Sequence, residues 1–308
     1  MLGEVFRYAD ETLRTPPCVA EDQYSAKERV LALSWTVVPK PRQRSVLRLA
    51  FGKLYFTLKR YCYWYFSGTE FAQSKGFHGD FPFVVFSHQT PLLRKLRKVE
   101  MWLQYNKVAN LRIAVKKIDG VVLHPGETFS YWRLIGKPTA RKGYKAGMVL
   151  FNGTFTPGIG GGLCQLSNLI YWMTLHTPLT VVERWRHSYD VFPDVNRTQP
   201  FGSGATCSYN YIDLQIRNNT RHSFYLRVFL TEEFLAGEWR SDQPVQQKYE
   251  VYEKDHLITH EPWGGYVRHN RIYRRVVDDG EVVRDELVAE NHAIMMCQPL
   301  LAGSAETC

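Results

Sequence analysis

The chain has 308 residues, of which 44% are hydrophobic and 22% charged, and its formal net charge is +9. This length and composition exclude a disordered or fibrous protein and suffice for one large domain, or for a main domain with a smaller appendage. The positive charge favours acidic partners such as anionic lipid, although it is more often found in a soluble basic enzyme. No nucleic-acid-binding motif is present, so we expect no nucleic-acid partner.

The six cysteines, at positions 18, 62, 164, 207, 297 and 308, are spread over the whole chain without a C-x-x-C motif. This spacing predicts neither a zinc ribbon nor a disulfide-stapled mini-domain, so most of the thiols should be free. We therefore expect no metal and no other cofactor.

The N-terminal region, residues 1–85, is predicted to be helical or irregular. It begins MLGEVFRYADETLRTPPC, which contains acidic residues and lacks the apolar segment of a secretory signal peptide. No later stretch is a clean membrane span. These features predict a protein that is cytoplasmic or peripheral at the membrane.

Residues 45–66, SVLRLAFGKLYFTLKRYCYWYF, are apolar and aromatic but are interrupted by Arg48, Lys53, Lys59 and Arg60. A basic amphipathic helix on an anionic membrane surface has this pattern. A helix that packs on the main domain and keeps its basic edge in water has the same pattern and is the more common case.

The next segments predict an α+β fold with a mainly antiparallel sheet. Thr90-Pro91 fits a helix start, so we expect one or two helices over residues 91–117. After Asp119-Gly120, short extended runs with one strong helix at about 163–176 indicate a mixed domain from about 110 to 235. Residues 241–308 should form a β-rich extension with a hairpin turn at Asp279-Gly280.

A glycine run precedes Cys164 in the stretch GIGGGLCQLSN, residues 158–168. Glycines allow positive φ angles and close approach to the backbone, so we expect residues 158–162 to line the main cleft. Cys164 then falls in the first turn of a buried helix, where free amides and the helix dipole favour a thiolate and can hold an oxyanion. The side-chain amides of Gln165 and Asn168 lie nearby.

His187, at the end of the predicted strand in VERWRHSYD, is a candidate base for Cys164. The pattern is equally typical of a cysteine that packs at a helix start and a histidine at a strand end. Arg184 and Arg186 alternate along the strand, which suits either a carboxylate site or two solvated cations. Cys207 stands beside Thr206 in a strand pattern and is predicted to point into a core. A zinc site built from Cys164, His176, His187 and Cys207 lacks ligand spacing, so we do not expect one.

The blocks HPGETFSYWRLIG, KGYKAGMVLFNG, GGGLCQLSN, ERWRHS and PFGSGATCSYNYIDLQIRN occur in this order and resemble the VanW family. We accordingly expect a VanW domain over residues 86–240. The resemblance implies a link to glycopeptide (vancomycin) resistance and cell-wall metabolism. Some relatives are regarded as cysteine L,D-transpeptidases that act on peptidoglycan stem peptides.

The resemblance places the family's cysteine at Cys164 and its histidine at His187. Many relatives carry an acidic residue before the Ala-Thr pair of the last block, whereas this chain has Gly204 there. That leaves Asp213 or Asp190 as the candidate to orient His187.

The leading hypothesis is thus an acyl-transfer enzyme whose partner is a peptidoglycan stem peptide or precursor. Its expected catalytic residues are Cys164, His187 and Asp213, and its expected substrate-binding residues are Gly160, Gly161, Gly162, Gln165, Asn168 and Arg184. The alternative is a non-catalytic accessory protein that binds a cell-wall precursor or peptide. Transpeptidation takes place outside the cytoplasm, so the missing signal peptide argues for the alternative.

Overall fold

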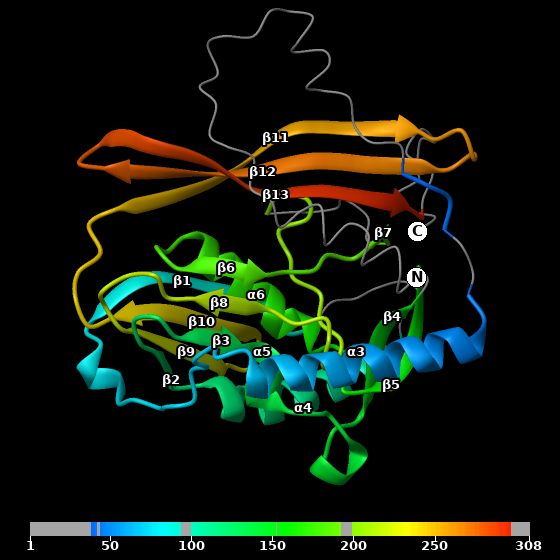
Figure 1. Ribbon diagram of the computed structural model, residues 1–308, viewed down its shortest axis with the longest axis horizontal. Coiled ribbons are helices and arrows are strands. Elements are labelled where there is room, and N and C mark those ends of the chain that lie inside the picture. Colours follow the sequence, from blue (N-terminus) through cyan, green and yellow to red (C-terminus); the bar gives the residue numbers. More distant parts are fainter. Residues whose placement is uncertain (1–37, 42–43, 94–99, 152, 192–198, 297–308) are drawn as a thin grey trace, which may run out of the picture.

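The computed structural model describes residues 38–41, 44–93, 100–151, 153–191 and 199–296 (Figure 1). The predictions for residues 1–37, and the cysteines at 18, 297 and 308, lie outside these ranges. The fold is α+β, as predicted. Its helices in the described residues are α3 (Val46–Phe66), α4 (Met101–Ile118), α5 (Tyr131–Ile135) and α6 (Cys164–Leu175), with short 3-10 turns η2 (His78–Asp80) and η3 (Ala140–Lys142).

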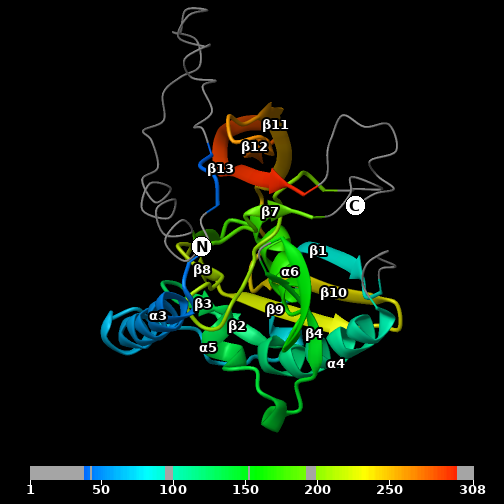
Figure 2. The ribbon, with the colours of Figure 1, turned by 90° about the vertical axis from the view of Figure 1, so that its right-hand side faces the viewer.

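The main sheet has four antiparallel strands. In spatial order they are β1 (Phe83–Pro91), β10 (Phe234–Ser241), β9 (Phe224–Leu230) and β2 (Val121–Leu123). Helix α6 packs against β1 and β10, and α4 contacts β9 from the other side (Figure 2). Leu166, Ile170 and Met173 of α6 have no exposed surface, and Trp239 of β10 donates its indole N–H to Thr174. The apolar periodicity of α6 is therefore explained by burial in the main core.

Two smaller units complete the main domain. A three-stranded antiparallel sheet contains β3 (Thr128–Ser130), β8 (Gln215–Arg217) and β6 (Thr180–Glu183). A separate hairpin is formed by β4 (Ala146–Phe151) and β5 (Thr154–Ile159), which run directly into the glycine run. This hairpin and β6 lead the chain to and from α6.

The C-terminal strands form a second sheet above the main domain (Figure 1). It contains β11 (Lys248–His260), β12 (Tyr266–Asp278) and β13 (Glu281–Met295), with the short β7 (Tyr189–Asp190) parallel to the end of β13. The predicted hairpin turn is confirmed: Asp279 and Gly280 have φ angles of 48° and 87° between β12 and β13. Two successive positive φ angles match the twist of an antiparallel hairpin.

The predicted helix from residue 91 is wrong at its start. Residues 83–91 form β1, which pairs with β10, and the helix α4 begins only at Met101. Thr90-Pro91 closes a strand because the preceding FVVFSHQT is rich in β-forming residues. β1 is an edge strand, so the missing N–H of Pro91 leaves no gap inside the sheet.

Helix α3 lies along the outside of the main domain and is attached through its C-terminal half (Figure 1). The Arg60 guanidinium binds both carboxylate oxygens of Glu183, at 2.7 and 2.5 Å. The Tyr61 hydroxyl is 2.6 Å from that of Tyr209, and Trp64 is 6% exposed. One face of α3 thus packs on the domain, as the commoner interpretation of the sequence required.

The opposite face of α3 is exposed. Leu47, Phe51 and Leu58 are 71%, 69% and 54% exposed. Among the helices of the described ranges, none is both long enough and apolar enough to cross a bilayer.

Replacing Arg60 with alanine tests how far α3 contributes to stability. The side chains of Arg60 and Glu183 are 11% and 19% exposed, so removal of the cation leaves a largely buried carboxylate without its charge partner. We expect Arg60→Ala to lower the free energy of unfolding by about 3 kcal/mol in urea titrations. The exposed Arg48→Ala should change it by less than about 0.5 kcal/mol. Equal midpoints for the two variants would contradict a stabilising role of the ion pair.

Candidate functional site

Cys164 is the first residue of α6, directly after the glycine run. The residue before it, Leu163, provides no side-chain cap, so the positive end of the helix dipole is directed at the cysteine. The Cys164 sulfur is partly buried and lies 3.5 Å from the Cys207 sulfur, 3.6 Å from the Cys207 carbonyl oxygen and 3.9 Å from the Thr206 hydroxyl. Cys164 is therefore surrounded by polar groups and a second thiol.

His187 is positioned near Cys164 by the pairing of two irregular segments. The Thr206 amide donates to the Trp185 carbonyl at 2.8 Å, which forms an isolated β-bridge. This bridge places the Thr206 hydroxyl 3.3 Å from Nδ1 of His187. The structure thus brings together Cys164, His187, Thr206 and Cys207, and the predicted Cys/His pair lies in one cluster.

The two thiols of the cluster have opposite acidities. The pKa of Cys164 is held well below its ordinary value, first by the hydrogen bond from the Cys207 thiol and then by a hydrogen bond and the charge of His187, against the effect of burial. The pKa of Cys207 is raised well above its ordinary value by burial and by its bond to Cys164. The arrangement therefore favours a Cys164 thiolate beside a Cys207 thiol.

Arg184 is occupied by contacts within the protein. Its guanidinium donates to the carbonyls of Gly202 and Gly204 and to the Asn291 side chain, and it lies over the Tyr171 ring of α6. These contacts hold the segment that carries Thr206 and Cys207 against α6. They indicate a positioning role for Arg184.

Gln165 and Asn168 also bind protein groups. Gln165 donates to the Thr90 hydroxyl and the Pro91 carbonyl, at 3.0 and 2.9 Å, and so ties α6 to the end of β1. Asn168 accepts the amide of Ala205 at 2.8 Å. A Cβ on Gly204 would lie 2.7 Å from the Asn168 oxygen, which accounts for glycine at this position.

The glycine run packs closely on the protein itself. A Cβ at Gly161 would lie 2.2 Å from the Gly147 backbone in β4, and one at Gly162 would lie 2.2 Å from the Lys107 side chain. Gly160 and Gly162 also have positive φ angles, of 78° and 89°. The need for close approach was predicted correctly, but the neighbours on these faces are β4, α4 and Pro138.

Asp213 does not orient His187. Its buried carboxylate accepts hydrogen bonds from the Ser130 hydroxyl and the Trp132 amide, at 2.6 and 2.9 Å, where α5 begins. Burial, followed by the charge of Glu183, raises the pKa of Asp213 to about 7. Asp190, the other candidate, forms an ion pair with Arg268 at 3.3 Å. The hydroxyl of Thr206 takes the position next to His187 that a carboxylate was expected to hold.

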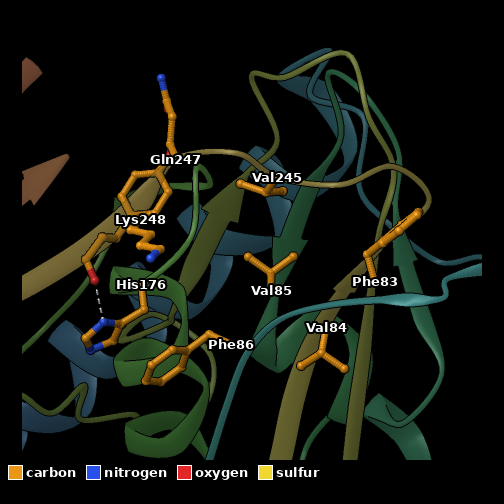
Figure 3. Close-up of a pocket in the computed structure, with 9 residues that line it drawn as sticks. Phe83, Val84, Val85, Phe86, His176, Val245, Gln247 and Lys248 are labelled. Carbon is orange, nitrogen blue, oxygen red and sulfur yellow. Dashed lines mark hydrogen bonds between the residues drawn. The ribbon is translucent and has the colours of Figure 1, made fainter. Parts of the chain in front are cut away.

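Two cavities of the described residues lie away from Cys164. One of about 260 Å³ is lined by residues 83–86 of β1, by His176 and by residues 245 and 247–249 (Figure 3). His176 is at the other end of α6, where Nδ1 donates to the Tyr249 carbonyl and the ring stacks on Phe86. The other, of about 360 Å³, is lined by residues 67–70, Gly126 and Arg217. Neither of these two cavities includes the glycine run.

The sequence interpretation missed the role of Cys207 and did not consider Thr206. Cys207 does pack against the main core, as predicted, but its sulfur also contacts Cys164. A second cysteine inside the block GSGATCSYNY was the available signal. Across the described ranges, no group of three or more His, Cys, Asp or Glu side chains is arranged to hold a metal ion.

Comparison with known proteins identifies similar chains. Residues 106–240 match the family described as "VanW like protein". The Vancomycin B-type resistance protein VanW of Enterococcus faecalis is 35% identical over 237 residues, which cover 76% of this chain and 85% of that protein. The uncharacterized protein YoaR of Bacillus subtilis is 33% identical over 119 residues, which cover 39% of this chain and 38% of that protein. No solved structure matches.

The acidity of Cys164 can be measured by alkylation with iodoacetamide as a function of pH. Because its pKa is lowered, Cys164 should already be a thiolate and react at pH values below the ordinary titration range of a cysteine thiol. Cys207→Ala removes the hydrogen bond that contributes most to stabilising the thiolate, so it should move the reaction midpoint of Cys164 to higher pH. Peptide mass spectrometry follows each cysteine separately. A reaction midpoint of Cys164 in the ordinary range of a cysteine thiol would contradict the assignment of a thiolate.

Proposed function

The chain belongs to the VanW family, and on this premise we propose that it is a cysteine acyltransferase of the L,D-transpeptidase type. The observation that carries the proposal is the place of the Cys164 sulfur at the start of α6, in one cluster with His187, whose hydrogen bond and charge help to lower the pKa of the thiol. A low-pKa cysteine beside a histidine at a helix N-terminus is the arrangement that nucleophilic catalysis by sulfur requires. The family resemblance suggests amides of peptidoglycan stem peptides as substrates.

The proposed reaction has two steps. In the first, the Cys164 sulfur attacks the amide carbon, a thioester forms, the C–N bond breaks, and His187 supplies a proton to the departing amine. In the second, an amine or water attacks the thioester, gives a proton to His187 and releases Cys164. An amine yields a cross-link, and water yields hydrolysis. Thr206, 3.3 Å from Nδ1 of His187, fixes the orientation of the ring.

Stabilisation of the tetrahedral oxyanion is assigned to amides at residues 162–164. The amides of Gly160 and Gly161 already donate to the carbonyls of Lys145 and Gly158, at 3.0 and 2.9 Å. The amides at the beginning of α6 lie at the positive end of the helix dipole, where a developing negative charge is favoured. The rigid packing of Gly161 on Gly147 keeps this turn in place.

Cys164→Ser tests the nucleophile. The change hardly alters volume but removes the thiolate, so we expect turnover of stem-peptide substrates to fall by roughly three orders of magnitude or more. The thermal unfolding midpoint should stay close to that of the unaltered protein. Cys62→Ser, on the exposed face of α3, is the matched control and should retain activity. If the unaltered protein binds such peptides without turning them over, and Cys164→Ser binds equally well, the non-catalytic accessory function is the correct one.

We also propose that α3 attaches the protein to an anionic membrane surface. Leu47, Phe51, Leu54, Leu58 and Tyr65 are all more than half exposed and recur at helical spacing along one stripe. Arg48 and Lys59 are exposed on the same helix and would meet anionic headgroups. An apolar stripe with basic residues beside it is typical of interfacial helices. This position would bring the site close to cell-wall precursors at the membrane.

Vesicle sedimentation tests this attachment. The double variant Leu47→Glu/Phe51→Glu should weaken binding to phosphatidylglycerol vesicles at least about tenfold, because it removes apolar contact and adds negative charge. Binding by the unaltered protein should fall as salt rises. Val282→Glu/Val283→Glu, at residues that are each 56% exposed in the C-terminal sheet, is the matched control and should bind normally. Equal loss in both variants, or no binding by the unaltered protein, would refute the proposal.

A further inference from the structure

Cys164 and Cys207 are unusually placed for two free thiols. They are separated by forty-three positions, yet their sulfurs lie 3.5 Å apart. A disulfide bond has an S–S length of about 2.05 Å, so the sulfurs need to approach by only about 1.5 Å. We propose that these two cysteines are a redox pair, joined in a disulfide under oxidising conditions, and that this bond switches off the Cys164 nucleophile.

The segment that carries Cys207 is held against α6 independently of the sulfurs. The Ser167 hydroxyl donates to the Ala205 carbonyl at 2.7 Å, and Asn168 accepts the Ala205 amide at 2.8 Å. Thr206 is bridged to Trp185 on its other side. The two sulfurs are thus kept in proximity by the fold, which raises the effective concentration of one thiol at the other.

Cys207 itself lies between two isolated bridges, at Thr206 and Ser208, and outside any named strand. A shift of the Cys207 side chain by an ångström or so therefore disturbs no hydrogen bonds between the strands of a sheet. Local adjustment can therefore bring the sulfurs to bonding distance while the α6 contacts remain.

The two thiols are chemically unequal, which favours one of them as the first to react with a peroxide. Cys164 is the better nucleophile, because its thiolate is favoured, and Cys207 remains protonated beside it. A low-pKa cysteine next to a second thiol is the usual arrangement of a peroxidatic cysteine and its resolving partner. This asymmetry assigns the first oxidation to Cys164.

The oxidant that we propose is hydrogen peroxide. The Cys164 thiolate attacks one peroxide oxygen, so that an S–O bond forms, the O–O bond breaks, and after protonation a sulfenic acid and water result. The Cys207 thiol then attacks the Cys164 sulfur, an S–S bond forms, and the S–O bond breaks. The hydroxyl group leaves with the Cys207 proton as water. Two electrons pass from the sulfurs to the peroxide, and a dithiol reductant reverses the change.

The test uses the full chain in which Cys18, Cys62, Cys297 and Cys308 are replaced by serine. After treatment with hydrogen peroxide, the protein should lose the mass of two hydrogen atoms, and neither remaining thiol should be alkylated after denaturation. Peptide mapping should recover one cross-linked pair containing Cys164 and Cys207, and dithiothreitol should restore both thiols. In the same background, Cys207→Ser should stop at a Cys164 sulfenic acid that a 1,3-dione reagent traps.

The proposal is overturned if Cys164 proceeds to the sulfinic acid while Cys207 can still be alkylated, or if peroxide leaves both thiols free. The switching role rests on the proposed function, whereas the mass and mapping measurements do not depend on activity. Where the reduced protein turns over stem peptides, the oxidised protein should lose that turnover and regain it with dithiothreitol. Full turnover of stem peptides by the disulfide form would refute the proposed switch. A disulfide that forms in a protein without any turnover would refute only the proposed enzymatic function, and the redox pair would stand.

Discussion

The guanidinium of Arg184 is the contact on which the arrangement of the site depends. It donates to two backbone carbonyls, those of Gly202 and Gly204, and to the side chain of Asn291, while its flat face covers Tyr171. A partly buried cation is costly unless its donors are satisfied, and here neutral oxygens satisfy them. Because the two carbonyls lie in the loop before Thr206, Asn291 in β13 and Tyr171 in α6, a single side chain fixes these three segments relative to each other.

The C-terminal sheet consequently contributes to the site through the loop that precedes Cys207. Asn270 of β12 donates to the Phe201 carbonyl at 2.7 Å and is joined to Asn291 by a further bond of 2.9 Å. Gly202 lies so close to Asn291 that a Cβ would be 2.4 Å from its amide. The loop is thus held by the second sheet on one side and by α6 on the other. The β-rich segment after residue 241 therefore helps to position Thr206 and Cys207.

Within this frame, hydrogen bonding outweighs burial at Cys164. A buried thiol is normally harder to ionise, yet the Cys207 thiol and His187 both favour the thiolate. At Cys207 burial and the bond to Cys164 act together and raise the pKa, so this thiol retains its proton. The same short separation that lowers the pKa of Cys164 also places a resolving thiol beside it. The proposed nucleophile and the proposed redox pair thus have one structural origin.

The amino-acid sequence by itself determined the features that depend on neighbours along the chain. The apolar periodicity of residues 163–176 set the burial of α6 and the place of Cys164 in its first turn, and Asp279-Gly280 set a hairpin turn through local φ angles. At Thr90-Pro91 such local signals were misleading, because pairing of β1 with β10 decided the structure there. The residues of the family blocks, with their number and order, indicated the VanW family.

Only the tertiary structure decided which groups meet. Gln165, Asn168, Arg184 and Asp213 have the donors and acceptors of a substrate site, but each of them binds protein atoms that lie far away in the sequence. The groups next to Cys164 were likewise fixed by the β-bridge between Trp185 and Thr206. These residues lie in irregular segments, and no periodicity in the sequence predicts that they pair. A polar side chain satisfies its hydrogen bonds with whatever the fold brings near, so its role is determined by long-range packing rather than by residue type.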